Sequence, residues 1–331
     1  MKITLIVLSS LLALAIVVYL LGPKPQHPFY ATSLPAVPAI DKLENYVKSI
    51  ESQHKIKPNN EAEIVWADTS VKQQTEYAIV YLHGYSASKE EGNPVHINLA
   101  KKIKANLYLS RLADHGVDTV SAMAYSTADR LWESAKQALE IGKRLGKKVI
   151  LIGTSTGGTL ALKLASTYPD IYSVILISPN VAINDKLAFL ANNPWGLQMS
   201  RLVMGGKEQI VEGKSDEYKK YWYTKYRLES VVQLEELVET TMTEETFKKI
   251  KQPLLLLYYY KNEQEQDPVV KVEAMLKMYD ELGTPANLKQ KVAIPNGGNH
   301  VLGSYITSKD IEGVQKAIDN FITTTLKIKE N

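Results

Sequence analysis

The sequence predicts an α/β fold: a mostly parallel central sheet with flanking helices and one helical cap insertion. Two observations lead to this prediction. From Glu61 onward, short runs rich in β-branched residues alternate with longer segments of helical periodicity, which is the order expected of an open α/β sheet. The runs at 149–152 and 174–177 are apolar without alternation, as in parallel strands that helices cover on both faces.

The first 21 residues are expected to form a membrane anchor. Residues 3–21 hold few polar or semi-polar members: Thr4, Ser9, Ser10 and Tyr19. A helix of about 19 residues spans roughly 28 Å, close to the hydrocarbon thickness of a bilayer. The run ends without the small-x-small site of a cleaved signal peptide. An uncleaved signal anchor is therefore favoured over a cleaved signal or a buried helix, and the remaining chain is expected to be extracytoplasmic.

A proline-rich segment, about residues 22–40, follows and is predicted to be an extended linker. The folded domain is expected over residues 41–331. Its predicted strands are 64–66, 78–82, 106–109, 148–152, 173–177, 254–258 and 291–294. Residues 129–145 and 159–167 place their apolar side chains on one helical stripe. About residues 182–251 contain no strand-like apolar run and are predicted to form a mostly helical insertion.

Composition excludes several function classes. With 39 Lys and Arg against 36 Asp and Glu, and the signs mixed along the chain, no basic patch predicts nucleic-acid binding. The chain has no cysteine, which excludes a disulfide framework, a thiolate metal site and a cysteine nucleophile. No pair of its six histidines has the spacing of a zinc helix. No cofactor or metal is therefore expected, and the sequence specifies no oligomeric state.

The segment Gly153-Thr154-Ser155-Thr156-Gly157 follows directly on a predicted buried strand and opens the next helix. This context matches a nucleophile elbow, in which the serine occupies a strained turn and side chains two residues away would collide with it. Gly153 and Gly157 avoid that collision. The helix N-terminus behind Ser155 favours a developing oxyanion. Ser155 is therefore the predicted nucleophile, and a plain tight-packed turn is the alternative.

A serine hydroxyl needs a positioned base, and the base needs an orienting acid. The predicted base is His300, which lies in a glycine-rich loop after the last predicted strand. The predicted acid is Asp267, with Glu263 and Glu265 of the same loop as rivals. Because an Asp before Pro is also a common turn residue, a structural role for all three acids is the remaining alternative.

An oxyanion is bound by two backbone N–H groups. Thr156, the residue after the nucleophile, is expected to supply one of them. Tyr85 is expected to supply the other, because Leu82-His83-Gly84-Tyr85 follows an earlier strand and Gly84 permits the required backbone geometry. His83 itself is expected to be structural.

Together these residues resemble the α/β-hydrolase superfamily over about residues 61–325. The segment His83-Gly84-Tyr85-Ser86-Ala87-Ser88 resembles the His-Gly-aromatic oxyanion segment of the carboxylesterase and monoacylglycerol-lipase-like branch. Arg111-Leu112-Ala113-Asp114-His115-Gly116 is similar to that branch's Arg-Leu-Pro-Gly-His-Gly loop, with Ala and Asp in place of Pro and Gly. The resemblance implies an α/β-hydrolase fold, a Ser155-His300-Asp267 triad, oxyanion donors at Tyr85 and Thr156, and a cap over residues 182–251.

The expected function is that of a serine hydrolase that cleaves carboxylic esters, either small esters or monoacylglycerol-like lipids, through an acyl-enzyme. The expected partners are this ester substrate and, through residues 3–21, the membrane. Aromatic residues of the cap either line an acyl pocket or pack the cap onto the body: Trp195, Tyr221, Trp222, Tyr223 and Tyr226. A thioesterase or acyltransferase would use the same residues. A non-catalytic, membrane-tethered binding module is the alternative of another class.

Overall fold

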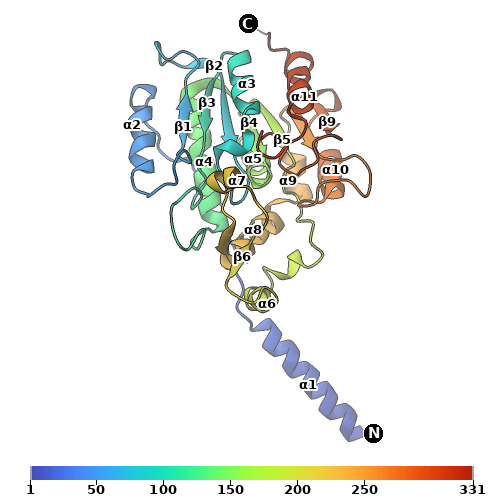
Figure 1. Cartoon of the computed structure of the whole chain (residues 1–331). Helices are drawn as coiled ribbons and strands as arrows, with labels where there is room; N and C mark the ends of the chain where they lie inside the picture. The colour runs from blue at the N-terminus through green and yellow to red at the C-terminus, as the bar shows by residue number, and fades with distance from the viewer. Residues whose placement is uncertain (1, 330–331) are drawn as a thin grey trace.

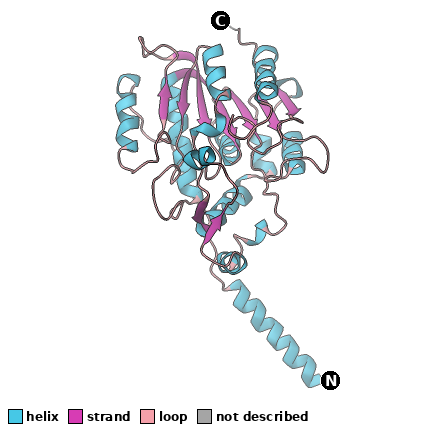
Figure 2. Cartoon of the chain, viewed as in Figure 1, coloured by secondary structure: helices cyan, strands magenta, loops and turns pink. Residues whose placement is uncertain are grey.

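A seven-stranded sheet forms the centre of the computed structural model, which describes residues 2–329 (Figures 1 and 2). Its strands are β1 (Glu63–Val65), β2 (Thr75–Leu82), β3 (Asn106–Leu109), β4 (Gly146–Thr154), β5 (Ser173–Ile177), β8 (Leu254–Tyr258) and β9 (Lys289–Ala293). Their order is β1-β3-β2-β4-β5-β8-β9, and every neighbouring pair is parallel except β1 with β3. The predicted fold class is confirmed, and each of the seven predicted strands overlaps one of these.

Helices cover both faces of the sheet. One face carries α2 (Ile40–Glu51), α4 (Ala128–Leu145), α5 (Thr156–Thr167), α9 (Glu244–Lys249) and α10 (Val272–Glu281). The other carries α3 (Val95–Lys102) and α11 (Ile311–Thr324). Within β4, Val149 and Leu151 pack in the first core and Ile150 and Ile152 in the second, because successive strand side chains point to opposite faces. This double burial explains the uninterrupted apolar run.

The cap leaves the sheet after β5 and returns to it at β8. It contains α6 (Gly196–Val203), α7 (Asp216–Tyr221), α8 (Leu228–Thr241) and α9, together with a two-stranded antiparallel sheet of β6 (Glu208–Ile210) and β7 (Lys225–Arg227). Single 3-10 turns lie at η1 (Lys89–Gly92), η2 (Ala188–Leu190) and η3 (Ala286–Leu288). The small sheet was not predicted, because three-residue strands are too short to produce a recognisable hydrophobic period.

Residues 22–39 form no helix or strand, and part of this segment lies along α4. Trp132 Nε1 of α4 donates a hydrogen bond to Ala31 O (2.8 Å), and Lys136 Nζ donates to Ser33 O (2.8 Å). Tyr30 packs edge-on against Trp132. The proline-rich segment is therefore extended and also held against the domain.

Helix α1 (Lys2–Leu20) projects away from the domain and ends beside α6 (Figure 1). Its stretch Ile3–Leu20 is long and apolar enough to cross a membrane by length and composition, and none of it is buried against the rest of the chain. A signal sequence has the same length and composition, so these two properties are shared by an anchor that is kept and a signal that is cleaved.

Candidate active site

Ser155 lies at the tight turn between β4 and α5. Its φ is +52° and its ψ is −118°, a backbone conformation that costs energy for any residue with a side chain. A Cβ at Gly153 would lie 2.4 Å from Gly157 O, and a Cβ at Gly157 would lie 1.9 Å from Leu82 O. The two glycines therefore allow the turn to close on itself and against the end of β2.

The parallel strands bring the loops that carry the predicted residues to one edge of the sheet. Leu82 at the end of β2 pairs with Gly153, and Thr154 at the end of β4 pairs with Ile177. The loops that follow these strands, and those after β8 and β9, leave from this same edge. Ligands of open α/β sheets bind outside the carboxyl ends of the strands.

His300 and Asp267 are in direct contact and both are buried. His300 Nδ1 lies 2.7 Å from Asp267 Oδ2, while Oδ1 accepts from the N–H groups of Val269 (2.8 Å) and Val270 (3.1 Å). Burial opposes the charge on Asp267, but the His300 imidazole and the two backbone donors hold the pKa of this carboxyl below its usual value. His300 Nε2 is buried without a hydrogen-bond partner among residues 2–329.

The rival acids of the same loop point elsewhere. Glu263 Oε1 accepts from Tyr260 OH (2.9 Å), and Glu265 forms an ion pair with Lys261. Of the three acids that the sequence offered, it is Asp267 that the structure brings to His300.

The predicted oxyanion donors lie on either side of Ser155. Thr156 begins α5, so its N–H has no acceptor within the helix. Tyr85 follows Gly84, at which a Cβ would lie 3.0 Å from Ser155 Cβ. The backbone at Gly84 therefore lies against Ser155. We term residues 83–88 the oxyanion loop, after the role that the sequence predicts for them.

His83 holds this loop in place. Its Nε2 accepts from the N–H of Leu112 (3.0 Å), so the proton is on Nδ1, which donates to Gly84 O (2.9 Å). Burial, and then the neighbouring His115, lower the pKa of His83 well below its usual value, so the ring is neutral. Both ring nitrogens are occupied, which fits the structural role expected of His83.

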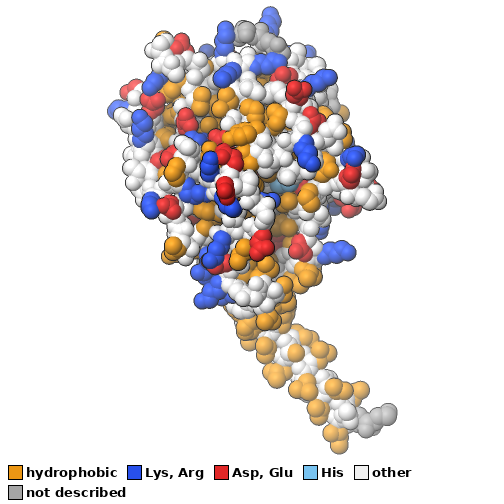
Figure 3. All heavy atoms as spheres, viewed as in Figure 1, with side chains coloured by type: hydrophobic (Ala, Val, Ile, Leu, Met, Phe, Trp, Pro, Cys, Tyr) orange, Lys and Arg blue, Asp and Glu red, His pale blue; other side chains and the backbone are white. Residues whose placement is uncertain are grey.

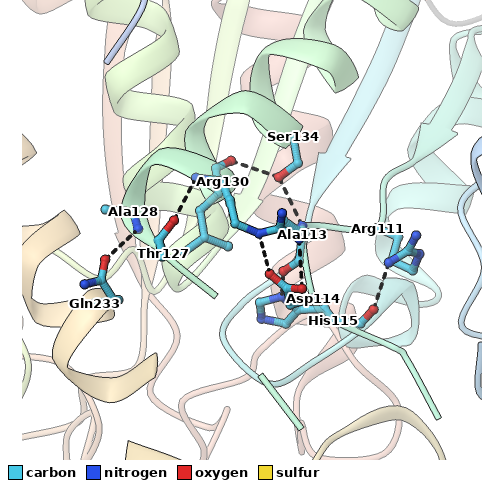
Figure 4. A network of polar contacts seen from close by, with 10 residues as sticks. Arg111, Ala113, Asp114, His115, Thr127, Ala128, Arg130, Ser134 and Gln233 are labelled. Carbon is cyan, nitrogen blue, oxygen red and sulfur yellow. Dashed lines mark hydrogen bonds and ion pairs between the residues drawn. The ribbon is translucent and has the colours of Figure 1, made fainter. Parts of the chain in front are cut away.

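Residues 111–116 form the loop whose Leu112 N–H donates to His83. Asp114 adopts a positive φ of 63°, a conformation that Asp tolerates better than most residues. Figure 4 shows Arg130 of α4 reaching the Asp114 carboxylate, with Nε and Nη2 each 2.9 Å from an oxygen, and Ser134 Oγ accepting from Ala113 N–H (3.1 Å). Asp114 stands where the similar Arg-Leu-Pro-Gly-His-Gly loop has Gly. Here the ion pair with Arg130 holds the Asp114 side chain in this turn.

The cap is bonded to the oxyanion loop. Tyr85 OH shares a hydrogen bond with Ser230 Oγ of α8 (2.6 Å), and Tyr223 N–H donates to Ser86 O (2.9 Å). The Tyr85 ring also stands edge-on to Tyr226, with centroids 5.2 Å apart. The position of Tyr85, and with it its backbone N–H, therefore depends on the cap.

The cap also covers the serine and the histidine. Trp222 packs against Ala87 of the oxyanion loop and Val301, the residue after His300. Ser155 and His300 are each 7% exposed. These contacts place Trp222 of the cap beside the loop that carries His300.

Glu91 is an acid at the site that the sequence analysis did not single out. Its carboxylate accepts hydrogen bonds from Gly84 N–H and Tyr81 OH, and it is buried. Burial raises the pKa of Glu91 to about 7, against the opposing effects of Gly84 N–H and the His300 charge. The run Lys89-Glu90-Glu91 has the composition of an exposed loop, so no sequence pattern marks Glu91 as a residue that η1 buries.

Metal-ligand clusters and cavities are two other features that could mark a site in the described part of the chain. Within residues 2–329, no group of three or more His, Cys, Asp or Glu side chains is placed to hold a metal ion. A cavity of about 400 Å³ lies between α2 and α4, lined by Arg111 and Gln137 among others, and neither Ser155 nor His300 lines it. That cavity therefore does not belong to the chemistry at the sheet edge.

Solved esterases and lipases share this fold. A structure reported with LipS and LipT, two metagenome-derived lipolytic enzymes, superimposes with a TM-score of 0.65 at 20% identity, covering 81% of this chain and 98% of that one. A soluble variant of monoglyceride lipase from Saccharomyces cerevisiae gives 0.59 at 11% identity (91% and 98%). Est1E from Butyrivibrio proteoclasticus with ferulic acid bound gives 0.54 at 16% identity (80% and 95%). No curated protein matches the sequence.

The family is established by sequence. A family model described as serine aminopeptidase, S33, matches residues 115–302, which is more than half of the 331-residue chain. The matched range includes Ser155, Asp267 and His300. The protein therefore belongs to the S33 serine aminopeptidase family of α/β-hydrolases, in agreement with the superfamily that its motifs resemble.

Proposed function

We propose that this hydrolase is a membrane-anchored serine esterase that cleaves carboxylic esters, either small esters or monoacylglycerol-like lipids. The observation that carries the proposal is the 2.7 Å contact between His300 Nδ1 and Asp267 Oδ2, together with a buried His300 Nε2 that has no hydrogen-bond partner in the described part of the chain. An imidazole oriented at one nitrogen and vacant at the other is ready to accept a proton. The strained turn at Ser155 supplies the hydroxyl.

In the proposed reaction, Ser155 Oγ transfers its proton to His300 Nε2 and attacks the ester carbonyl. Asp267 fixes the imidazole tautomer and stabilises the imidazolium. The N–H groups of Tyr85 and Thr156 bind the oxyanion, and the leaving alcohol takes the proton from His300. His300 then deprotonates a water molecule, which releases the acyl group and restores Ser155.

The proposed division of the chain is an anchor at residues 1–21, a linker at 22–40 and the catalytic domain at 41–331, with its cap at 182–251. Helix α1 is proposed to hold the domain at the extracytoplasmic surface of the membrane. This location favours a substrate that is presented by lipids or near them.

Labelling of the full chain with a fluorophosphonate probe tests the proposal. Strong labelling is expected of the wild type, and its loss is expected in Ser155→Ala and His300→Ala, because the probe reacts only with an activated serine. Ser52→Ala, which removes an exposed hydroxyl, is the matched control and should label fully. A folded wild type that stays unlabelled would favour the non-catalytic binding module.

The substrate class is tested on unlabelled samples of the same proteins. A panel of one acyl group as oxygen ester, thioester and amino-acid anilide separates an esterase from a thioesterase and from the peptidase chemistry named in the family description. Product analysis with an added alcohol separates hydrolysis from acyl transfer. The highest kcat/KM is expected for the oxygen ester.

The pH dependence of ester hydrolysis is expected to depend on Glu91. Burial alone would lower the pKa of His300, but Asp267, and then Glu91, raise it above its usual 6.5. Because the base acts when neutral, kcat/KM should rise with pH through this raised pKa. Glu91→Gln removes a negative charge and should move that rise to lower pH.

A pH profile of kcat/KM on a soluble ester measures this shift. Glu90→Gln is the control, since the neighbouring carboxylate binds Asn93 Nδ2 (2.7 Å) and does not act on His300. An unchanged profile in Glu91→Gln, or an equal shift in both variants, contradicts the assignment.

A further inference from the structure

The cap has an exposed apolar face at its narrow end. Among the described residues outside α1, 15 large hydrophobic side chains are exposed, and eight of them fall between residues 187 and 210. We term these eight the cap apolar face: Leu187, Phe189, Trp195, Met199, Leu202, Val203, Met204 and Ile210. Leu202 is 83% and Val203 78% exposed. Apolar surface gathered in this way indicates a binding partner.

The cap apolar face begins where α1 ends. Trp195 Nε1 donates to Val18 O (3.0 Å), one of the carbonyls that the last turn of a helix leaves without a partner, and Trp195 N–H donates to Pro23 O (2.9 Å). Figure 3 shows hydrophobic atoms running without a break from α1 onto this end of the domain. If α1 spans a bilayer, α6 therefore lies at the surface of that bilayer.

Basic residues also lie along the segment 186–207. Its basic residues are Lys186, Arg201 and Lys207, with Asp185 and Glu208 at its two ends, and Arg201 is paired with Glu229 of α8. Basic residues beside an apolar face are attracted to anionic lipid headgroups, and a tryptophan is favoured at the boundary between headgroups and acyl chains. Among the described residues, no feature comparable to α1 would position a partner protein at the cap apolar face.

We propose that the cap apolar face inserts into the headgroup and acyl boundary of the leaflet from which α1 emerges. The chain is then attached at two points, α1 across the bilayer and α6 in its surface. The substrate is a lipid ester taken from that leaflet. This inference rests on the membrane anchoring proposed above and is separate from the chemistry at Ser155.

A second observation links this end of the cap to the active site. A cavity of about 240 Å³ lies between the segment that follows α1 and the cap, lined by Pro23, Pro25, Leu197 and Val232 among others. Its walls come from the start of the linker, α6, α8 and residues 124–127 before α4. The same helix α8 carries Ser230, which holds Tyr85 of the oxyanion loop. Lipid contact at α6 is thereby linked through α8 to the site.

Site-specific labelling tests the insertion, and the absence of cysteine makes any introduced cysteine unique. The full chain carrying Leu12→Cys, Leu202→Cys or Val71→Cys is labelled with an environment-sensitive fluorophore. Each protein is reconstituted into vesicles of equal parts phosphatidylcholine and phosphatidylglycerol, with or without acyl-chain spin-labelled lipid as quencher. Val71 lies in the loop before β2, at the end of the domain opposite to α1 (Figure 1).

Quenching at positions 12 and 202, with none at position 71, is the expected result. Quenching at position 12 without quenching at position 202 overturns the inference and leaves the anchor intact. No quenching at position 12 overturns the anchor and the inference together, whereas fluorophosphonate labelling of Ser155 is unaffected by either result.

An activity measurement gives the second readout. The double variant Leu202→Glu with Val203→Glu should lose about tenfold in the hydrolysis of a monoacylglycerol presented in these vesicles, because it places charge where the apolar face enters lipid. Its hydrolysis of a soluble short-chain ester should stay within about twofold of wild type, since neither residue contacts the oxyanion loop or His300. Val71→Glu is the matched control. Equal losses on both substrates, or no loss on either, contradict the inference.

Discussion

Asp267→Asn is expected to lower kcat for ester hydrolysis by about 10⁴-fold. Asp267 Oδ1 accepts from the N–H groups of Val269 and Val270, so in the variant this position must be taken by the amide oxygen. The amide nitrogen then faces His300 Nδ1 and donates to it. The imidazole is thereby forced to carry its proton on Nε2, where it cannot accept the proton of Ser155.

Steady-state kinetics on a soluble ester measure this loss, and the fluorophosphonate labelling rate should fall with it. Glu263→Gln and Glu265→Gln are the controls, because both acids bind other residues of the loop, and both should retain wild-type kcat. A wild-type kcat in Asp267→Asn, together with a loss in either control, would identify a different acid.

The sheet was predictable because the burial of its central strands determines the composition of short stretches of sequence. A strand segment buried on both faces is apolar at successive positions, and residues 149–152 of β4 and 174–177 of β5 have this property. The edge strands β1 and β9 are less apolar and only partly buried, so the predicted runs 64–66 and 291–294 are displaced by one or two residues from the observed strands.

The clustering of the site residues could also be predicted, because the loops that carry them follow parallel strands and these strands end at one edge of the sheet. The sequence analysis kept a structural role open for Asp267, because an Asp before Pro tends to accept from backbone N–H groups two residues ahead. In the structure it does so with Val269. This local bond leaves the second carboxylate oxygen for His300.

The remaining features depend on contacts between distant segments. Residues 29–34 are held on α4 largely by their backbone carbonyls, as in the bond from Trp132 Nε1 to Ala31 O. Every residue has a backbone carbonyl, so no sequence pattern predicts such a hydrogen bond. The burial of Glu91 is of the same kind, because its acceptor role depends on where Gly84 N–H lies in space.

Gly157→Ala is expected to lower the free energy of unfolding by about 3 kcal/mol, because an added Cβ would lie 1.9 Å from Leu82 O and 2.7 Å from His83 O. These neighbours are backbone atoms, which cannot rotate away as a side chain could. The clash should push α5 away from the end of β2. Thr156 moves with α5 and Tyr85 with β2, so the two proposed oxyanion donors separate.

The labelling rate of the folded variant should therefore fall by about 10²-fold, the effect of losing one oxyanion donor. Equilibrium denaturation measures the first effect and fluorophosphonate kinetics measure the second. Gly206→Ala is the matched control, since an added Cβ there meets nothing within 4 Å, and both quantities should stay close to wild type. If Gly157→Ala were destabilised but labelled at the wild-type rate, the end of β2 would have shifted to relieve the clash without moving Tyr85. The second oxyanion donor would then have to be sought outside the loop that Gly157 supports.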